Sequence, residues 1–320
     1  MDRPGPLAVL RKAVSTYAQR YLADENHWCV ALSGGPDSLA LTAVAAEQRP
    51  TVALVVDHGL QPDSSAVAQT AASQALDLGC DDARVLTVEV GRQGGPEAAA
   101  RAARYAVLRE ASAGASVLLG HTLDDQAETV LLGLGRGSGA RSIAGMRPYR
   151  PPWCRPLLSV RRAITRAACE ELGLKPWLDP HNVDPVFTRA RLRAEVLPLL
   201  EDVLGGGVSE ALARTASSLR EDCSALDDLA QTELDEALAD TGLDVRRLRE
   251  LPNALRRRVI RGWLLAGGAI DLTDEQIRRV DDLVVDWHGQ GGVAVGSSLR
   301  RERLVAARAG GALRLNREPM

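Results

Sequence analysis

Short, uninterrupted apolar runs alternate with helical patterns through the first half of the chain. The runs read "HWCVAL", "TVALVVDH", "ARVLTVEV" and "ASVLLGH", at residues 27–32, 51–58, 83–90 and 115–121. Continuous apolar runs are typical of parallel strands that are covered on both faces. The stretches between them have helical patterns, at residues 37–48, 64–79 and 96–113. This alternation of strands and helices predicts an α/β fold with a doubly wound parallel sheet.

The strand pattern fades after about residue 150. The elements predicted from there are helices at 161–174, 189–204, 208–240, 252–266 and 273–287, with short strands within 291–308. Three consecutive glycines at 205–207 separate two of these helices and mark the candidate domain boundary. We therefore expect a catalytic α/β domain over residues 1–204. Residues 205–320 should form a linker helix and a smaller, mainly helical C-terminal domain.

Composition narrows the class of protein. A chain of 320 residues that is 45% hydrophobic and 25% charged is typical of a globular protein of about two domains. The net charge of −3 excludes a uniformly basic nucleic-acid coat but allows a local basic patch. Five widely spaced cysteines without a C-x-x-C pair argue against a disulfide scaffold, a zinc ribbon or an iron–sulfur site. No apolar stretch approaches a membrane span, and we expect a cytoplasmic protein.

Polar clusters follow three of the predicted strands: "SGGPDS" (33–38), "DHGL" (57–60) and "GHTLDD" (120–125). The carboxyl ends of parallel strands are where such sheets bind ligands. The first cluster has two interpretations. Either it is a tight turn capped by Ser38 or Asp37, or its glycines let backbone amides approach a phosphate at a helix N-terminus. It is not a Walker A loop, because no lysine follows the glycines.

Two carboxylates in "GHTLDDQAETVLL" (120–132) are three residues apart on a predicted helix. Asp125 and Glu128 then share one helix face. They could simply favour the positive end of the helix dipole, or Asp125 could ligate a metal together with His121. They could also hold an ammonium group beside a nucleotide site.

The sequence resembles a known family at these motifs. "SGGPDS" resembles the PP-loop of the N-type ATP pyrophosphatases, and H-x-x-D-D-x-x-E-T resembles the tRNA(Ile)-lysidine synthase branch of that superfamily. Further stretches agree in order: "VDHGL", "EAAARAARYAVL", "RGSGARSIAGM", "RPLL" and "WLDPHNVDPVFTRARLRAEVLP". Two positions depart from the family's pattern: Ala190 replaces an expected Asn, and His181 an expected Ser.

The resemblance implies a Rossmann-like PP-loop fold and lysidine formation. ATP would adenylate O2 of a cytidine in the CAU anticodon of an isoleucine tRNA, with release of pyrophosphate. Free lysine would then attack C2 and displace AMP. The implied ATP-binding residues are Ser33, Gly34, Gly35, Pro36, Asp37, Ser38 and His58. Asp37 would also lie near Mg²⁺, and His58 could equally be a structural histidine.

Other residues receive roles from the same resemblance. Asp125 and Glu128 would bind lysine, and a carboxylate would accept its proton. Arg101 or Arg104 would offset charge at the α-phosphate, with Arg101 taken as the catalytic candidate. The candidates for tRNA binding are Arg189, Arg193, Arg256, Arg257 and Arg258.

The basic run "VRRLRELPNALRRRVIRG" (245–262) supports an RNA partner. It holds seven arginines and one glutamate in a chain of net charge −3. It is either a solvated helix face or a surface that contacts an RNA backbone. The rival functions are a PP-loop tRNA thiolase, which usually needs paired cysteines, and a nucleotide-binding sensor without chemistry. The sequence indicates no membrane association and no obligate protein partner.

Overall fold

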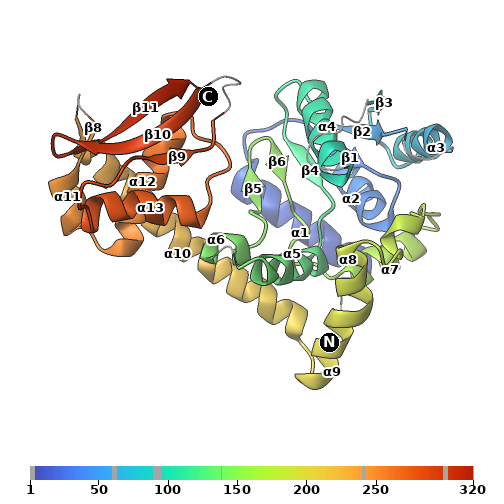
Figure 1. The fold of residues 1–320 in the computed structure, drawn as a ribbon. Helices are drawn as coiled ribbons and strands as arrows, with labels where there is room; N and C mark the ends of the chain where they lie inside the picture. The colour runs from blue at the N-terminus through green and yellow to red at the C-terminus, as the bar shows by residue number, and fades with distance from the viewer. Residues whose placement is uncertain are drawn as a thin grey trace. The chain divides into compact units, whose positions relative to one another are not determined.

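The computed structural model describes residues 4–59, 63–88, 96–137, 139–239, 242–297 and 302–319, without the side chains of 96–98. The chain divides into two compact units, Met1–Ser217 (unit 1) and Ser218–Met320 (unit 2). The division falls inside one long helix, α10 (Val208–Ala237). Figure 1 shows both units, which are described separately below.

Unit 1 is built around a six-stranded sheet with the order β3-β2-β1-β4-β6-β5. The strands are β1 (Trp28–Leu32), β2 (Thr51–Asp57), β3 (Asp82–Thr87), β4 (Val117–Leu119), β5 (Tyr149–Arg150) and β6 (Trp153–Cys154). All neighbouring pairs are parallel except β5 with β6. The chain moves outward from β1 to β3 and then returns to place β4 on the other side of β1. This reversal opens a crevice at the carboxyl ends of β1 and β4.

Helices cover both faces of this sheet. Trp28, Val30 and Leu32 of β1 pack in a core with four helices, whereas Cys29 and Ala31 pack in a second core with one. The four helices are α1 (Pro6–Tyr21), α2 (Pro36–Ala46), α3 (Ser64–Asp77) and α7 (Arg162–Glu171), and the one is α4 (Pro96–Ala111) (Figure 1). The predicted doubly wound sheet is confirmed.

Shorter helices complete unit 1. They are α5 (Leu123–Gly135), α6 (Ala140–Ile143), η1 (Pro180–Asn182), α8 (Thr188–Arg191), a π-helical turn η2 (Leu192–Val196) and α9 (Leu197–Val203). The single helix predicted over 189–204 is thus interrupted. Pro198 has no N–H to donate to the preceding turn, so a regular ladder cannot run through it.

The three glycines between α9 and α10 form a closed turn. Gly205, Gly206 and Gly207 all have positive φ, at 79°, 89° and 73°. The Glu201 carboxylate accepts hydrogen bonds from the amides of Val208 and Ser209, at 2.9 and 3.0 Å. These bonds lower the pKa of Glu201 and cap the start of α10.

Unit 2 packs three helices and the C-terminal part of α10 with an antiparallel sheet of order β7-β8-β11-β10-β9. The helices are α11 (Val245–Glu250), α12 (Asn253–Ala266) and α13 (Asp274–Val285). The strands are β7 (Leu238–Ala239), β8 (Gly242–Asp244), β9 (Val293–Val295), β10 (Glu302–Ala309) and β11 (Ala312–Pro319). Because β10 and β11 have eight residues each, unit 2 is richer in β-structure than the sequence indicated.

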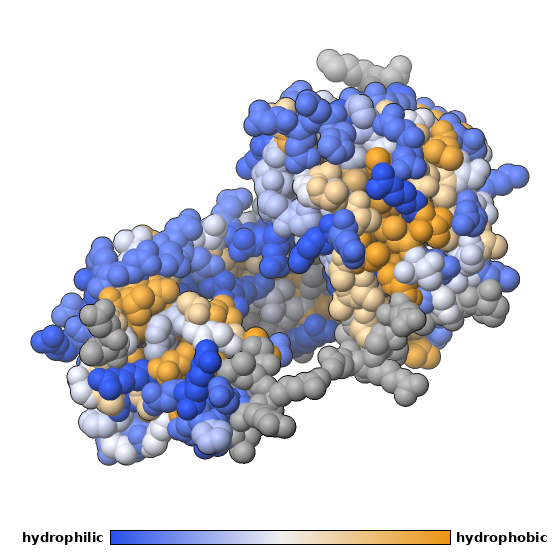
Figure 2. All heavy atoms as spheres, turned by 90° about the horizontal axis from the view of Figure 1, so that it is seen from above, coloured by the Kyte–Doolittle hydropathy of each residue, from blue (hydrophilic) through white to orange (hydrophobic). Residues whose placement is uncertain are grey.

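The cysteines and the helices can be compared with the predictions from composition. All five cysteines are free and buried, as expected of small core residues. None of the helices in the described ranges is both long and apolar enough to cross a membrane. Figure 2 shows that the visible face of each unit is mostly hydrophilic, with apolar side chains gathered in smaller patches.

Candidate active site

The loop between β1 and α2 leaves a helix N-terminus free of a side-chain cap. Gly35 is the N-cap residue of α2, and no side chain accepts a hydrogen bond there. Gly34 has φ +77°, a conformation that favours glycine. Ser38 Oγ instead lies 3.2 Å from Ser33 N and 3.0 Å from Gly35 O, and so shapes the loop from within. The capped-turn interpretation is therefore wrong, and the amides of this turn are available to an anion.

Gly120 brings the end of β4 against the start of α2. A Cβ atom at this position would lie 3.0 Å from Ser38 N and 3.1 Å from Asp37 O. Any side chain would force the two segments apart. The "SGGPDS" and "GHTLDD" clusters, predicted to share one edge of the sheet, are thereby adjacent in space.

A cavity of about 250 Å³ opens at the carboxyl ends of β1 and β2. Its lining includes Ser33, His58, Arg104, Trp177 and His181. Burial, followed by the charge of Arg104, lowers the pKa of His58 and keeps the ring neutral. His58 Nδ1 is buried and has no hydrogen-bond partner within the described residues. An orphaned polar atom in a cavity wall is a ready contact for a polar ligand.

The structure distinguishes the two arginines that the sequence left as alternatives. Arg104 lines the cavity. Arg101 is exposed, donates to Tyr105 Oη at 3.3 Å and stacks over the Tyr105 ring at 4.9 Å. Arg104 therefore reaches the cavity lining and Arg101 does not line it, although the charges of both lower the pKa of the buried His121.

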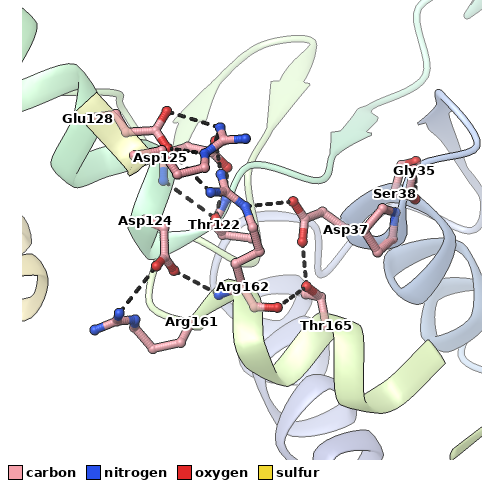
Figure 3. Close-up of polar contacts among 12 residues, drawn as sticks. Gly35, Asp37, Ser38, Thr122, Asp124, Asp125, Glu128, Arg161, Arg162 and Thr165 are labelled. Carbon is pink, nitrogen blue, oxygen red and sulfur yellow. Dashed lines mark hydrogen bonds and ion pairs between the residues drawn. The ribbon is translucent and has the colours of Figure 1, made fainter. Parts of the chain in front are cut away.

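The carboxylates of Asp125 and Glu128 meet on α5, as the i, i+3 spacing predicts. Arg162, the first residue of α7, lies between them: its Nη2 is 2.5 Å from Asp125 Oδ1 and its Nη1 is 3.3 Å from Glu128 Oε1. The other Asp125 oxygen accepts from Thr122 N at 2.8 Å in a capping box. Figure 3 shows these side chains converging from α5 and α7.

The same guanidinium reaches the start of α2. Arg162 Nε lies 3.2 Å from Asp37 Oδ2, and Thr165 Oγ1 donates to Asp37 Oδ1 (Figure 3). The backbone N–H of Arg162 donates to Asp124 Oδ2 at 2.7 Å. Arg162 was not a candidate from the sequence. Its position on the buried stripe of α7 with Thr165, three residues apart, is the signal that could have indicated it.

Arg189 and Arg193, predicted to contact tRNA, are placed against Glu128. Arg193 Nε is 2.8 Å from Glu128 Oε1, and Arg189 Nη1 is 3.6 Å from Glu128 Oε2. The Glu128 side chain is fully buried, whereas that of Asp125 is 18% exposed. Ala190, the departure from the family pattern, is buried beside them. In this arrangement the two arginines neutralise a buried carboxylate.

The pKa values of the titratable groups in this cluster are shifted in different directions. Burial raises the pKa of Asp37, against Thr165 and Arg162. Burial would also raise the pKa of Asp125, but Arg162, the Thr122 bonds and His121 outweigh it and lower the value. Burial lowers the pKa of His121 to about 3, so its imidazole is neutral. No group of three His, Cys, Asp or Glu within the described ranges is arranged to hold a metal ion.

The basic run of unit 2 differs in exposure from one arginine to the next. Arg256 is 4% exposed, and its donors serve Asp281, Leu251 O and Asn253 Oδ1. The prediction that Arg256 contacts tRNA is wrong in this placement, because its guanidinium is sealed in the core. Its neighbours are partly exposed: Arg257 pairs with Asp281 at 2.8 Å and Arg258 with Asp227 at 3.0 Å. The Arg246 side chain is 90% exposed.

Comparison with known proteins assigns the family. Residues 8–200 match the PP-loop domain, and residues 243–304 match the TilS substrate binding domain. Two relatives named tRNA(Ile)-lysidine synthase, from Mycolicibacterium paratuberculosis and Mycobacterium tuberculosis H37Rv, are 67% and 65% identical. Both matches span the whole of each chain. This chain belongs to the tRNA(Ile)-lysidine synthase family.

The family assignment made from the motifs is confirmed, as is its consequence that the chain is a ligase of the PP-loop superfamily. A solved structure supports the fold: the U34-tRNA thiolase NcsA from Methanococcus maripaludis matches with a TM-score of 0.57. The match covers 68% of this chain and 80% of the thiolase chain, at 19% identity. This likeness concerns architecture alone. The lysidine synthase domain matched at 243–304 lies entirely in unit 2.

Proposed function

We propose that the chain ligates lysine to C2 of the wobble cytidine in the CAU anticodon of tRNA(Ile). ATP adenylates O2 of the cytidine and pyrophosphate leaves; the ε-amine of lysine then attacks C2 and AMP leaves. Besides family membership, one observation supports this scheme: an uncapped phosphate loop and a buried acid pair are joined through one guanidinium. A nucleotide site and a cation site side by side are what the two steps require.

The first step uses the loop of residues 33–38 and the adjacent cavity. The amides at the start of α2 would bind the β- and γ-phosphates, since a helix N-terminus favours anions. His58 would contact the adenosine through its unpartnered ring nitrogen. We replace Arg101 by Arg104 as the residue that offsets charge at the α-phosphate, because Arg104 lines the cavity. Arginine suits this task because its charge is permanent and planar.

Magnesium fits this site through Asp37. A carboxylate near phosphates is a common Mg²⁺ ligand, and the ion takes its remaining ligands from phosphate and water. Bound there, the ion would neutralise charge on the leaving pyrophosphate. The Asp37 side chain is 22% exposed, so an ion can reach it from solvent.

The second step uses the acid pair on α5. Asp125 is its accessible member, so we propose that Asp125 contacts the lysine ammonium directly and that Glu128, which Arg189 and Arg193 neutralise, acts through its contact with Arg162. The amine must lose a proton before it attacks, and an ionised carboxylate can accept it. The lowered pKa of Asp125 keeps that carboxylate ionised.

The RNA is held by unit 2 in this proposal. An anticodon shared with a methionine tRNA cannot identify the substrate alone, so other parts of the tRNA must be read by shape and backbone. The exposed or partly exposed arginines Arg246, Arg257 and Arg258 are the candidates for phosphate contacts. We propose that the chain acts in the cytoplasm, where ATP, lysine and tRNA occur together, without an obligate protein partner.

Mass spectrometry of nucleosides tests the function. Purified chain, ATP, Mg²⁺, lysine and tRNA(Ile) with a CAU anticodon should yield lysidine, together with AMP and pyrophosphate. Methionine tRNA with the same anticodon is the matched control and should stay unmodified. Label from the α-phosphate of ATP should appear transiently on tRNA. Label from the γ-phosphate on tRNA would contradict the chemistry, and unchanged ATP would indicate a sensor.

A further inference from the structure

Arg162 contacts several carboxylates, although α7 does not need a charged residue for packing. The rest of the buried face of α7 is formed by Thr165, Ala168 and Cys169, which pack without a charge. The Arg162 side chain is only 10% exposed. Burial acts to lower its pKa, yet the surrounding carboxylates, Asp125 foremost, raise it.

The guanidinium distributes its donors one to each acid. Nη2 serves Asp125, Nη1 serves Glu128 and Nε serves Asp37, at 2.5, 3.3 and 3.2 Å. Only a planar fork offers donors in these fixed directions. A lysine at the same position would keep the charge but would present it as a single point. The geometry therefore depends on arginine as well as on positive charge.

We propose that Arg162 is the positioning residue that makes the α5 acid pair competent to bind lysine. It holds Asp125 and Glu128 together and ties them to Asp37 beside the phosphate loop. This inference rests on the proposed function, because it assigns a role within the same site.

Electrostatics give the expected sign. Asp37 and Asp125 both place negative charge in a partly desolvated space, and the charge of Asp125 acts to raise the pKa of Asp37. Arg162 offsets that repulsion. Without it, Asp125 would turn away from Asp37 or take up a proton, and in either case it would attract an ammonium less. Lysine affinity should therefore fall when Arg162 is lost.

The test compares Arg162→Gln and Arg162→Lys with Arg161→Gln. Arg161 is the preceding residue, is 38% exposed and pairs with Asp124 and Glu210, so it controls for loss of a neighbouring arginine. Each full-length variant is assayed for the KM of lysine, for kcat at saturating lysine and for labelled adenylate formed on tRNA without lysine. Thermal unfolding, monitored by circular dichroism, measures the folded fraction of each variant.

For Arg162→Gln we expect the lysine KM to rise about ten- to a hundredfold, the range that one charge-assisted hydrogen bond provides. Arg162→Lys should show a smaller rise, and adenylation should change less than lysine use in both. Arg161→Gln should keep the wild-type KM. If Arg162→Gln does not fold, the KM of Arg162→Lys decides.

An unchanged lysine KM in the folded variants would overturn the inference, even if kcat fell with the folded fraction, because that result means a structural role only. The proposed function would survive it as long as the wild type made lysidine. Failure of the wild type to transfer lysine would instead remove the proposed function, and the inference with it. The two failures are therefore distinguishable.

Discussion

Arg162 in unit 1 and Arg256 in unit 2 are both buried against carboxylates, and they differ in what lies around those carboxylates. Arg256 is 5% exposed on its side chain and pairs with Asp281, which is 1% exposed. Its other donors are filled by Leu251 O and Asn253 Oδ1. Of the acids around Arg162, Asp37 and Asp125 remain 22% and 18% exposed.

In the proposed function, this difference separates a structural pair from a functional one. Arg256 lies on α12 and Asp281 on α13, so their contact joins two helices of one closed core. Two acids of Arg162, Asp37 and Asp125, keep access to solvent, whereas Glu128 is fully buried. An arginine whose acidic partners keep access to solvent can share them with a substrate; one whose partners are sealed cannot.

Removal of Asp37, one of the acidic partners of Arg162, should have the largest effect on activity. Asp37→Ala deletes the carboxylate beside the phosphate loop. We expect pyrophosphate release to fall by about 10²–10³-fold or more, the loss typical of one group that stabilises transition-state charge. Pyrophosphate assays with circular dichroism as a folding control check this. Normal turnover by the folded variant would contradict the phosphate-loop assignment.

Arg256→Met should act on stability instead. It leaves Asp281 buried with only the Arg257 contact, and removing one partner of a buried pair costs about 3–5 kcal/mol of unfolding free energy. Urea unfolding of the full chain measures the loss. The double variant Arg256→Met with Asp281→Leu should recover most of it, because no buried charge is left unpaired and Arg257 is 31% exposed. A changed lysine KM in the folded Arg256→Met variant would contradict a purely structural role for Arg256.

Neutralising the acid pair should impair lysine use selectively. Asp125→Asn and Glu128→Gln keep shape and remove charge, so each should raise the lysine KM about ten- to a hundredfold while adenylation persists. Asp281→Asn is the matched control from unit 2 and should leave the KM unchanged. Poor adenylation with normal lysine affinity would assign the pair to Mg²⁺ or ATP.

The smallest effect is expected on the surface of unit 2. Arg246→Gln and Arg257→Gln should each lower the salt dependence of tRNA binding by about one unit of slope per lost phosphate contact. Filter binding over a range of salt concentrations measures the slope. Arg256→Met should leave it unchanged. If all variants had the same slope as the wild type, the basic run would be a solvated helix surface without phosphate contacts.

The sequence predicted the fold well wherever burial was continuous. Strands β1, β2 and β4 of unit 1 appear as apolar runs because parallel strands are covered on both faces, and the edge strand β3 is apolar in sequence although only partly buried. Strands β5 and β6 have two residues each and carry no pattern. Strand β11 was not predicted, since "ALRLNREP" contains exposed charged positions that resemble a loop.

The candidate site was predicted in its acids and less well in its arginines. The acids follow strand ends and share a helix face, which are local signals. The contacts of arginines are harder to predict, because the long side chain can reach partners far away in the sequence. Arg162, for example, contacts Asp37, which is 125 positions away. Periodicity still held a clue. Arg256 shares the buried stripe of α12 with Val259, Ile260 and Trp263, so its burial was foreseeable.

The turn at residues 205–207 bears on how such a chain could be recombined with its relatives. Three glycines resemble a flexible seam, and a designer of chimeric enzymes would choose it for a junction. Yet Glu201 holds the amides of Val208 and Ser209 across that seam, and Glu210 pairs with Arg161 beyond it. A crossover placed there would separate a cap from its helix. A junction inside α10, between Ser217 and Ser218, would instead follow the division between the two compact units.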